Sequence, residues 1–366
     1  MLMLQEVQEM QKFYPSISIW EIPEFIRDSI ENGVSVFLWG AGGVGKTTSV
    51  YDFFRKNNYE FEDIKLSQLN PITAVGLSYP DTDKKMTLRF LRERLKRLHD
   101  VLKEGGKAGI FFDEFLHANP DTIASVWELI LEKQLDGWKF DGLVVIAASN
   151  PNLKKMSLFN PALWSRFRHA VVVPKKEEVA QYIYSRTGCT HVASLLMARE
   201  DMLIVEDDLG FAANPRLWEY VARACCQTKT PTTGYLHSSV YSVFQLLKNI
   251  KHLEEIEKYL ENPKEIETIE DDFEKSIILW NLVFILQNKI RNNLLEIDKV
   301  KKFCLYLESK YGINNAFVLS IFSTIKDHHR KTLGLEKAVE IASEITGIKL
   351  ETLIEKITQN DGADTY

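Results

Sequence analysis

A glycine-rich run that ends in a lysine and two threonines carries the clearest chemistry of this chain. It follows the pattern G-x-x-x-x-G-K-[ST], whose glycines let backbone N–H groups approach a polyphosphate. The lysine can reach the outer phosphates, and the first threonine hydroxyl can bind Mg²⁺. The pattern therefore predicts a nucleoside triphosphate site formed by Gly40, Ala41, Gly42, Gly43, Val44, Gly45, Lys46, Thr47 and Thr48.

Two carboxylates follow a second apolar run. Asp113 and Glu114 come directly after Gly109-Ile110-Phe111-Phe112, 113 − 46 = 67 positions beyond Lys46. A strand that ends in this pair suits the same site, because Asp113 can bind Mg²⁺ beside Thr47. Glu114 can orient and deprotonate an attacking water.

Three further polar residues are candidates for the same site. Asn150 ends the apolar run 143–149, and ligands of parallel sheets lie at the carboxyl ends of the strands. Arg216 begins a predicted helix with Asn214 as N-cap and Pro215 at the first position, where a cation is unfavourable unless an anion compensates it. Arg166 and Arg168 flank Phe167 and are candidates to project from the edge of the domain.

The elements that position these residues follow from the hydrophobic pattern. Apolar strand-like runs alternate with helical patterns up to Pro174, which predicts βαβ units and a parallel sheet with helices on both faces. We expect five strands, at 34–39, 59–66, 109–113, 143–149 and 169–173. After Pro174 no strand is expected, and helical periodicity covers 176–187, 215–226, 238–260, 271–292, 297–311, 315–330 and 335–345.

In their order and spacing these motifs resemble those of an AAA+ ATPase, and specifically of the MoxR-type branch. The resemblance covers about residues 30–226 and also includes the stretches 67–80 and 114–120. It assigns Gly40–Thr48 as Walker A, Ile110–Glu114 as Walker B, Asn150 as sensor 1, Ser165-Arg166-Phe167 as the arginine finger and Asn214-Pro215-Arg216 as sensor 2.

The resemblance implies an ATP- and Mg²⁺-dependent enzyme that acts as a ring, usually of six copies. Arg166 would act on the γ-phosphate of a neighbouring subunit, with Arg168 as the alternative finger. The expected organisation is a nucleotide-binding core with an N-terminal helix over residues 1–174, a helical lid over 175–245 and an all-α domain over 246–366. The last domain would recruit a protein client or adaptor.

Bulk composition limits the remaining classes. The 366 residues are 45% apolar with a net charge of −6, so nothing in the charge requires a nucleic-acid partner. The N-terminus lacks the pattern of a signal peptide, and the most apolar stretch, 277–286, is too short to span a bilayer. Four cysteines without C-x-x-C spacing predict reduced thiols in a cytoplasmic protein and no structural zinc site.

Three functions stay open at this stage. The first is an ATP-driven remodeller of proteins. The second is a nucleic-acid motor or loader, for which the basic amphipathic stretch 84–98 could contact DNA. The third is a nucleotide switch without turnover, against which the presence of Glu114 argues. A GTPase is disfavoured, because Asn288-Lys289-Ile290-Arg291 lacks the aspartate that reads guanine in N-K-x-D.

Overall fold

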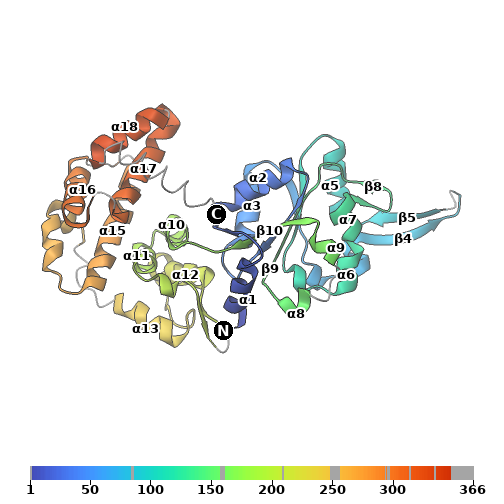
Figure 1. The fold of residues 1–366 in the computed structure, drawn as a ribbon, viewed down its shortest axis with the longest axis horizontal. Coiled ribbons are helices and arrows are strands. Elements are labelled where there is room, and N and C mark those ends of the chain that lie inside the picture. Colours follow the sequence, from blue (N-terminus) through green and yellow to red (C-terminus); the bar gives the residue numbers. More distant parts are fainter. Residues whose placement is uncertain are drawn as a thin grey trace. The chain divides into compact units, whose positions relative to one another are not determined.

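The computed structural model describes residues 2–83, 86–156, 161–207, 210–247, 256–292, 294, 297–312, 315–333 and 335–347. The chain divides into two compact units (Figure 1). The sheet unit comprises Met1–Glu178 and Ile204–Leu217, and the helical unit comprises Val179–Leu203 and Trp218–Tyr366.

A six-stranded sheet in the order β1-β10-β2-β9-β6-β3 forms the centre of the sheet unit, and all of its neighbouring strands are parallel. Three central strands are buried at every position, as expected when both faces of a sheet are covered. The strands are β1 (Ser16–Ile17), β2 (Ser35–Trp39), β3 (Glu60–Asp63), β6 (Ala108–Phe112), β9 (Val144–Ser149) and β10 (Phe167–Val172).

The predicted parallel α/β fold is confirmed, but the expected number of strands was too small. All five predicted strands are present, and β1 adds a sixth at the edge, where Ser16 pairs with Val171 and Ile17 with Val172. Two residues are too few to show a period in the sequence. Pairing with β10 makes this segment a strand.

Helices and hairpins also belong to the sheet unit. Its helices are α1 (Leu2–Gln11), α2 (Ile22–Glu31), α3 (Lys46–Lys56), α4 (Pro71–Val75), α5 (Glu93–Lys103), α6 (Pro120–Ser125), α7 (Trp127–Glu132), α8 (Leu153–Met156) and α9 (Pro161–Trp164). The hairpins pair β4 (Gly76–Asp81) with β5 (Met86–Leu91) and β7 (Gln134–Leu135) with β8 (Trp138–Lys139).

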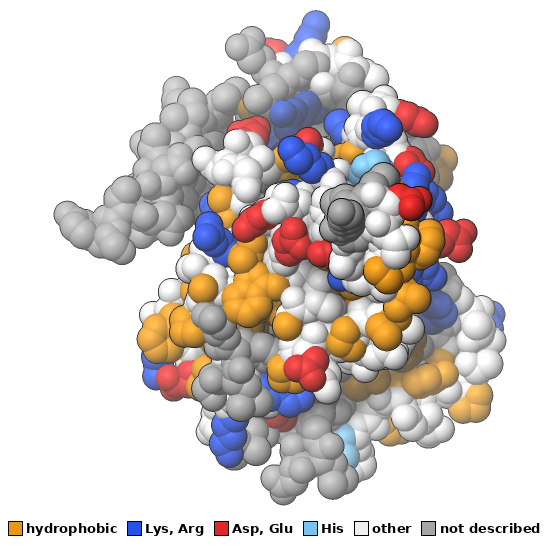
Figure 2. All heavy atoms as spheres, turned by 90° about the vertical axis from the view of Figure 1, so that its right-hand side faces the viewer, with side chains coloured by type: hydrophobic (Ala, Val, Ile, Leu, Met, Phe, Trp, Pro, Cys, Tyr) orange, Lys and Arg blue, Asp and Glu red, His pale blue; other side chains and the backbone are white. Residues whose placement is uncertain are grey.

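The basic stretch 84–98 is therefore not one continuous amphipathic segment. Leu88 and Leu91 lie in β5, whereas Leu95 and Leu98 lie in α5, and Lys84 and Lys85 fall outside the described residues. In Figure 2, which looks onto the end of the molecule with the β4–β5 hairpin, hydrophobic side chains lie among acidic and basic ones. The view shows no uniformly basic field.

A third hairpin corrects the expectation that no strand follows Pro174. β11 (Val205–Asp207) pairs antiparallel with β12 (Gly210–Ala213) and belongs to the sheet unit. Strands of three and four residues fall below the length at which alternation becomes visible in a sequence.

Within the helical unit, α11 and α17 pack against α15, whose residues Ile277–Phe284 are all buried. This confirms that the apolar stretch 277–286 lies in a buried helix. The helices are α10 (Lys176–Thr187, which begins in the sheet unit), α11 (Thr190–Ala198), α12 (Pro215–Ala222, which also begins there), α13 (Ser238–Leu247), α14 (Lys258–Glu261), α15 (Asp272–Arg291), α16 (Ile297–Tyr311), α17 (Ala316–Leu333) and α18 (Leu335–Thr346). Residues 248–255 of the predicted helix 238–260 lie outside the described residues.

The cysteines of the helical unit contradict the expectation of reduced thiols throughout. Cys189 and Cys226 form a disulfide, although 37 positions separate them in the sequence. Only the packing of α11 against the segment after α12 brings them together. No helix in the described part of the chain has the length and apolar character needed to cross a membrane.

Candidate nucleotide-binding site

The glycine-rich loop connects the end of β2 to the start of α3, the position that the motif requires. Gly45 is the N-cap of α3 with φ +104°, and Gly43 has φ +78°, conformations that glycine adopts without strain. A side chain at Gly43 would also collide with the Asn214 side chain, since its Cβ would lie 2.8 Å from Oδ1. The loop thus leaves its backbone N–H groups at the N-terminus of α3, where a phosphate is favoured.

Lys46 is the buried cation of this loop. Its ammonium donates hydrogen bonds to the carbonyl oxygens of Gly40 (2.7 Å) and Ala41 (2.9 Å). Burial lowers the pKa of Lys46 to about 8, Asp113 raises it and Arg216 lowers it further. A buried ammonium held only by neutral oxygens is well placed to gain from an anionic ligand.

Thr47 and Asp113 come together from different elements. The Thr47 hydroxyl donates to Oδ2 of Asp113 at 2.9 Å, although one residue lies in α3 and the other follows β6. A hydroxyl and a carboxylate in contact form the hard-oxygen donor set that suits Mg²⁺. The residues present therefore fit the predicted metal.

Glu114 has an unusual backbone. Its φ of 54° and ψ of 39° lie in the left-handed region, and its side chain is exposed. Such a conformation costs about 1–2 kcal/mol for a residue other than glycine, and strain of this kind clusters at functional sites. The turn brings the carboxylate next to the end of β6 rather than into the core.

Asn150 follows β9 and reaches the same edge of the sheet. Its Oδ1 lies 3.3 Å from the Lys46 ammonium. The carboxyl ends of β2, β6 and β9 therefore bring Lys46, Asp113 and Asn150 into one site, as the parallel order of the strands dictates.

Arg216 approaches the loop from a distant part of the sequence. Asn214 caps α12 by accepting a hydrogen bond from the Leu217 backbone (3.0 Å), which confirms the predicted N-cap with Pro215 at the first position. A Cβ built on Gly43 would lie 3.2 Å from Cβ of Arg216. Arg216 is exposed, so its guanidinium is available to an anion at the loop.

Arg166 and Arg168 differ sharply in their surroundings. Arg168 donates to the Ser29 hydroxyl (3.3 Å), forms an ion pair with Asp28 and lies 4.1 Å from the ring centre of Phe25. Arg166 is exposed, and its guanidinium makes no hydrogen bond or ion pair with the described residues. Arg168 is thus occupied by α2 of its own chain.

Aromatic packing fixes the segment that carries Arg166. Trp164 and Phe167 lie 5.5 and 5.4 Å from Phe37 and 6.4 and 6.2 Å from Phe115, measured between ring centres. Phe115 directly follows Glu114, so one buried cluster supports both segments. His169 also belongs to this cluster. Its ring accepts a hydrogen bond from the Trp39 indole, and burial lowers the pKa of its imidazole.

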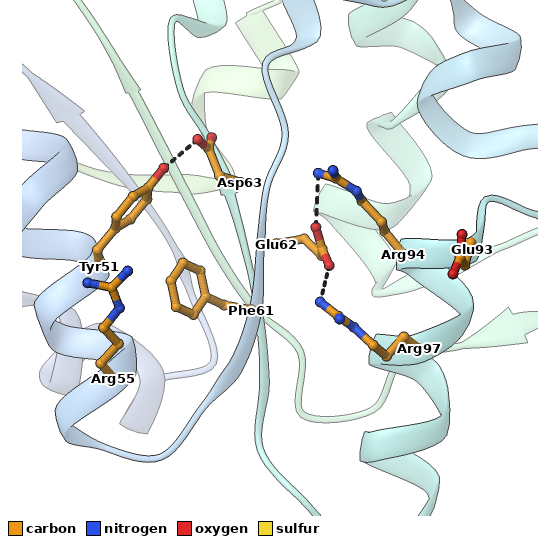
Figure 3. A pocket seen from close by; sticks show the side chains of 8 residues that line it. All are labelled: Tyr51, Arg55, Phe61, Glu62, Asp63, Glu93, Arg94 and Arg97. Carbon is orange, nitrogen blue, oxygen red and sulfur yellow. Dashed lines mark hydrogen bonds and ion pairs between the residues drawn. The ribbon is translucent and has the colours of Figure 1, made fainter.

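A cavity of about 570 Å³ lies beside the edge strand β3 (Figure 3). On one side Tyr51 donates a hydrogen bond to Asp63, and on the other Glu62 lies between Arg94 and Arg97 and pairs with both. Burial, and after it the nearby charge of Asp113, raises the pKa of Asp63. Asp63 was not among the predicted site residues, because the predicted strand 59–66 extends past it, whereas β3 ends at Asp63.

The comparisons with known proteins assign a class to this region. Residues 36–175 match the family described as "ATPase family associated with various cellular activities (AAA)". No curated protein matches the chain. The parallel sheet, the glycine-rich loop and this match together indicate an AAA+ P-loop fold in this region, followed along the chain by a helical region.

Solved structures similar to the chain include two proteins with low TM-scores. The RuvB Holliday junction branch migration motor of Thermotoga maritima has a TM-score of 0.31 at 14% identity, with 82% of this chain and 86% of that chain covered. The ORC2 protein of Aeropyrum pernix has a TM-score of 0.33 at 12% identity, with 91% and 94% covered. The family match, and not these two likenesses, supports the class.

Proposed function

We propose that this protein binds ATP with Mg²⁺ and hydrolyses it, and that it uses the cycle in a ring of identical subunits to remodel a protein client. The observation that carries the proposal is the meeting of Lys46, Thr47, Asp113, Asn150 and Arg216 around one glycine-rich loop. These residues come from four separate parts of the chain and include the cations and carboxylates that triphosphate hydrolysis uses.

Each residue has a distinct role in the proposed reaction. The N-terminus of α3 and the Lys46 ammonium bind the outer phosphates, and Asn150 orients the attacking water beside the γ-phosphate. Glu114 accepts the proton of that water. Thr47 and Asp113 would hold Mg²⁺, which would supply positive charge to the triphosphate when bound.

Arg166 is the better candidate for an arginine that acts on a neighbouring subunit. An arginine supplied in trans stabilises the transition state and raises the rate by about 10³–10⁵ in well-studied NTPases. Arg168 is engaged by Asp28, Ser29 and Phe25 of its own chain, whereas Arg166 projects from a segment that aromatic packing holds in place.

The proposal keeps the organisation expected from the MoxR-type resemblance, with a core over residues 1–174, a lid over 175–245 and a C-terminal domain over 246–366. Arg216 would sense the γ-phosphate and transmit its loss to the helices that follow. The C-terminal helices would recruit the client or its adaptor.

Ion pairs within the basic stretch argue against a nucleic-acid motor. Arg89 pairs with Asp136, Arg94 with Glu62, Lys96 with Asp100, and Arg97 with Glu60 and Glu62. Cations that are already neutralised offer little to a phosphate backbone, whose affinity depends on unpaired lysine and arginine.

Steady-state ATP hydrolysis at increasing protein concentration, with and without single-stranded DNA, tests the proposal. Turnover per subunit that rises with concentration and ignores DNA is the expected result. Strong stimulation by DNA would replace the remodeller with a motor. Tight ATP binding without hydrolysis at any concentration would contradict the proposed enzyme and favour a nucleotide switch.

A further inference from the structure

A cluster of two thiols and an imidazole lies within the helical unit. The sulfur atoms of Cys189 and Cys226 and a ring nitrogen of His191 all lie within 4.8 Å of one another. Cys189 is fully buried, and the other two are partly buried. The cluster belongs to no part of the proposed nucleotide site, which lies in the sheet unit.

The local backbone holds the two halves of this cluster in place. Cys189 is the N-cap residue of α11, and its backbone N–H donates to the buried Thr187 hydroxyl at 3.2 Å. Cys226 comes from a π-helix over Arg223–Thr228 that continues α12. The Gln227 side chain donates to the Arg186 carbonyl at 2.9 Å and joins the π-helix to the segment before Cys189.

The π-helix that carries Cys226 is a feature independent of the distances within the cluster. Such helices are rare, occur mostly as single turns within α-helices and are frequent at functional sites. The wider turn changes the direction of the side chains after Ala222. Of the adjacent residues Cys225 and Cys226, only Cys226 joins the cluster.

The imidazole of His191 lies beside the two sulfur atoms without taking part in the disulfide. Two thiolates and one imidazole are three ligands of the kind that zinc prefers, and in three-ligand sites a water takes the fourth tetrahedral position. The Cα atoms of Cys189 and Cys226 are 5.4 Å apart, so a small side-chain rearrangement separates the sulfurs to the roughly 3.8 Å spacing of zinc thiolates.

We propose that Cys189, His191 and Cys226 form a binding site for a soft divalent cation such as Zn²⁺, and that the metal and the disulfide are mutually exclusive forms of it. A dithiol reductant converts the disulfide to two thiols and is itself oxidised to a disulfide. Zn²⁺ then binds the two sulfurs as thiolates and releases two protons. In either form the site ties the start of α11 to the end of the helical run that begins at Pro215.

Metal binding by the full-length reduced protein tests the site. The protein is reduced with a phosphine, freed of metal with a chelator and titrated anaerobically with Co²⁺ and then Zn²⁺. We expect one equivalent of Co²⁺ with the intense near-ultraviolet absorption of cobalt–thiolate bonds, and its displacement by Zn²⁺. The oxidised protein should bind neither metal.

Two variants separate this site from the other thiols. His191→Ala keeps both cysteines and should weaken Zn²⁺ binding on the order of 100-fold, because one of three protein ligands is lost. Cys225→Ser removes the adjacent thiol, which lies outside the cluster, and should bind Zn²⁺ as the wild type does. Circular dichroism and ATP binding check that both variants fold.

Three results would overturn the proposal. Reduced wild type that takes up no Co²⁺ would show that the cysteines form only a disulfide. Unchanged zinc affinity in His191→Ala would exclude the imidazole as a ligand. Equal loss in Cys225→Ser would place the metal at a different set of thiols.

Discussion

The sheet unit and the helical unit both bury apolar side chains, but they differ in how their reactive residues come together. In the sheet unit, continuous apolar strands end in polar residues at one edge, so Asp113, Glu114 and Asn150 follow directly from the elements that bury the core. In the helical unit, α15 and its neighbours bury apolar side chains without such endings. Its reactive cluster instead joins residues that lie far apart in the sequence.

This difference shows in which unit the local sequence pattern predicts the residues of a functional site. A parallel sheet collects the residues after its strands at one edge, so position along each strand predicts position in the site. Helical packing has no such rule, because the residues that meet depend on how the helices cross. The predictions below test this contrast, in order of decreasing effect.

Arg166→Ala should have the largest effect. We expect ATP binding near that of the wild type and a loss of assembly-dependent hydrolysis of about 10³-fold or more, since transition-state charge goes unstabilised. The loss of hydrolysis is measured as turnover at saturating ATP and high protein concentration. Arg168→Ala is the matched control, which should lose stability through its contacts with α2 but keep turnover; the reverse pattern would exchange the two roles.

Glu114→Gln should retain ATP and slow its hydrolysis by about 10²–10⁴-fold, because the amide cannot accept the proton of the attacking water. Single-turnover hydrolysis of bound ATP separates this from a binding defect. Glu128→Gln in α7 is the control, because it removes the same charge from another position of the same unit. Wild-type turnover in Glu114→Gln would remove the residue from the mechanism.

Phe303→Ala tests the helical unit. Phe303 is fully buried in α16, so its loss should cost about 3–5 kcal/mol in the free energy of unfolding, measured by urea denaturation. ATP affinity should not change, because the nucleotide site lies in the sheet unit. Leu305→Ala, at an exposed position of the same helix, should cost far less. A large fall in ATP affinity for Phe303→Ala would show that the units are not independent.

The pH dependence of ATP affinity should report Lys46. Burial lowers its pKa to about 8 in the free protein, and phosphate charge next to the ammonium raises it again. The complex therefore binds more protons than the free protein above pH 8, so affinity should fall as pH rises past 8, by at most about tenfold per pH unit.

Calorimetry in buffers of different ionisation enthalpy measures this proton uptake directly. Lys133 is a half-buried lysine of the same unit whose pKa desolvation also lowers to about 8, but it donates to Ser35 and Ile130 instead of the loop. Lys133→Met should keep the pH dependence, and Lys46→Met should lose it together with most of the affinity. Persistence of the dependence in Lys46→Met would assign it to another group.

Glu114→Gly should have the smallest effect on the fold and should stabilise it. Relief of the left-handed backbone strain exceeds the extra entropy of glycine in the unfolded chain, with a net gain of about 0.5–1 kcal/mol. Asp52→Gly, in the middle of α3, should instead destabilise by about 0.3 kcal/mol, the difference between the helix propensities of aspartate and glycine. Urea denaturation of both variants measures the difference, and a loss of stability in Glu114→Gly would show that the turn is unstrained.

The sequence by itself determined the glycine-rich loop, the five main strands, the carboxylates after β6, Asn150 after β9 and the cap of α12. Each of these depends on neighbouring residues, since hydrophobic periodicity, glycine conformations and capping act within a few positions of the chain.

Only the tertiary structure decided the remaining features. It paired the two-residue β1 with β10, brought Arg216 to Gly43, engaged Arg168 with α2 and left Arg166 exposed, and joined Cys189 to Cys226. These features depend on contacts between residues distant in sequence, whose meeting is set by strand order and helix packing, and no local pattern carries that information.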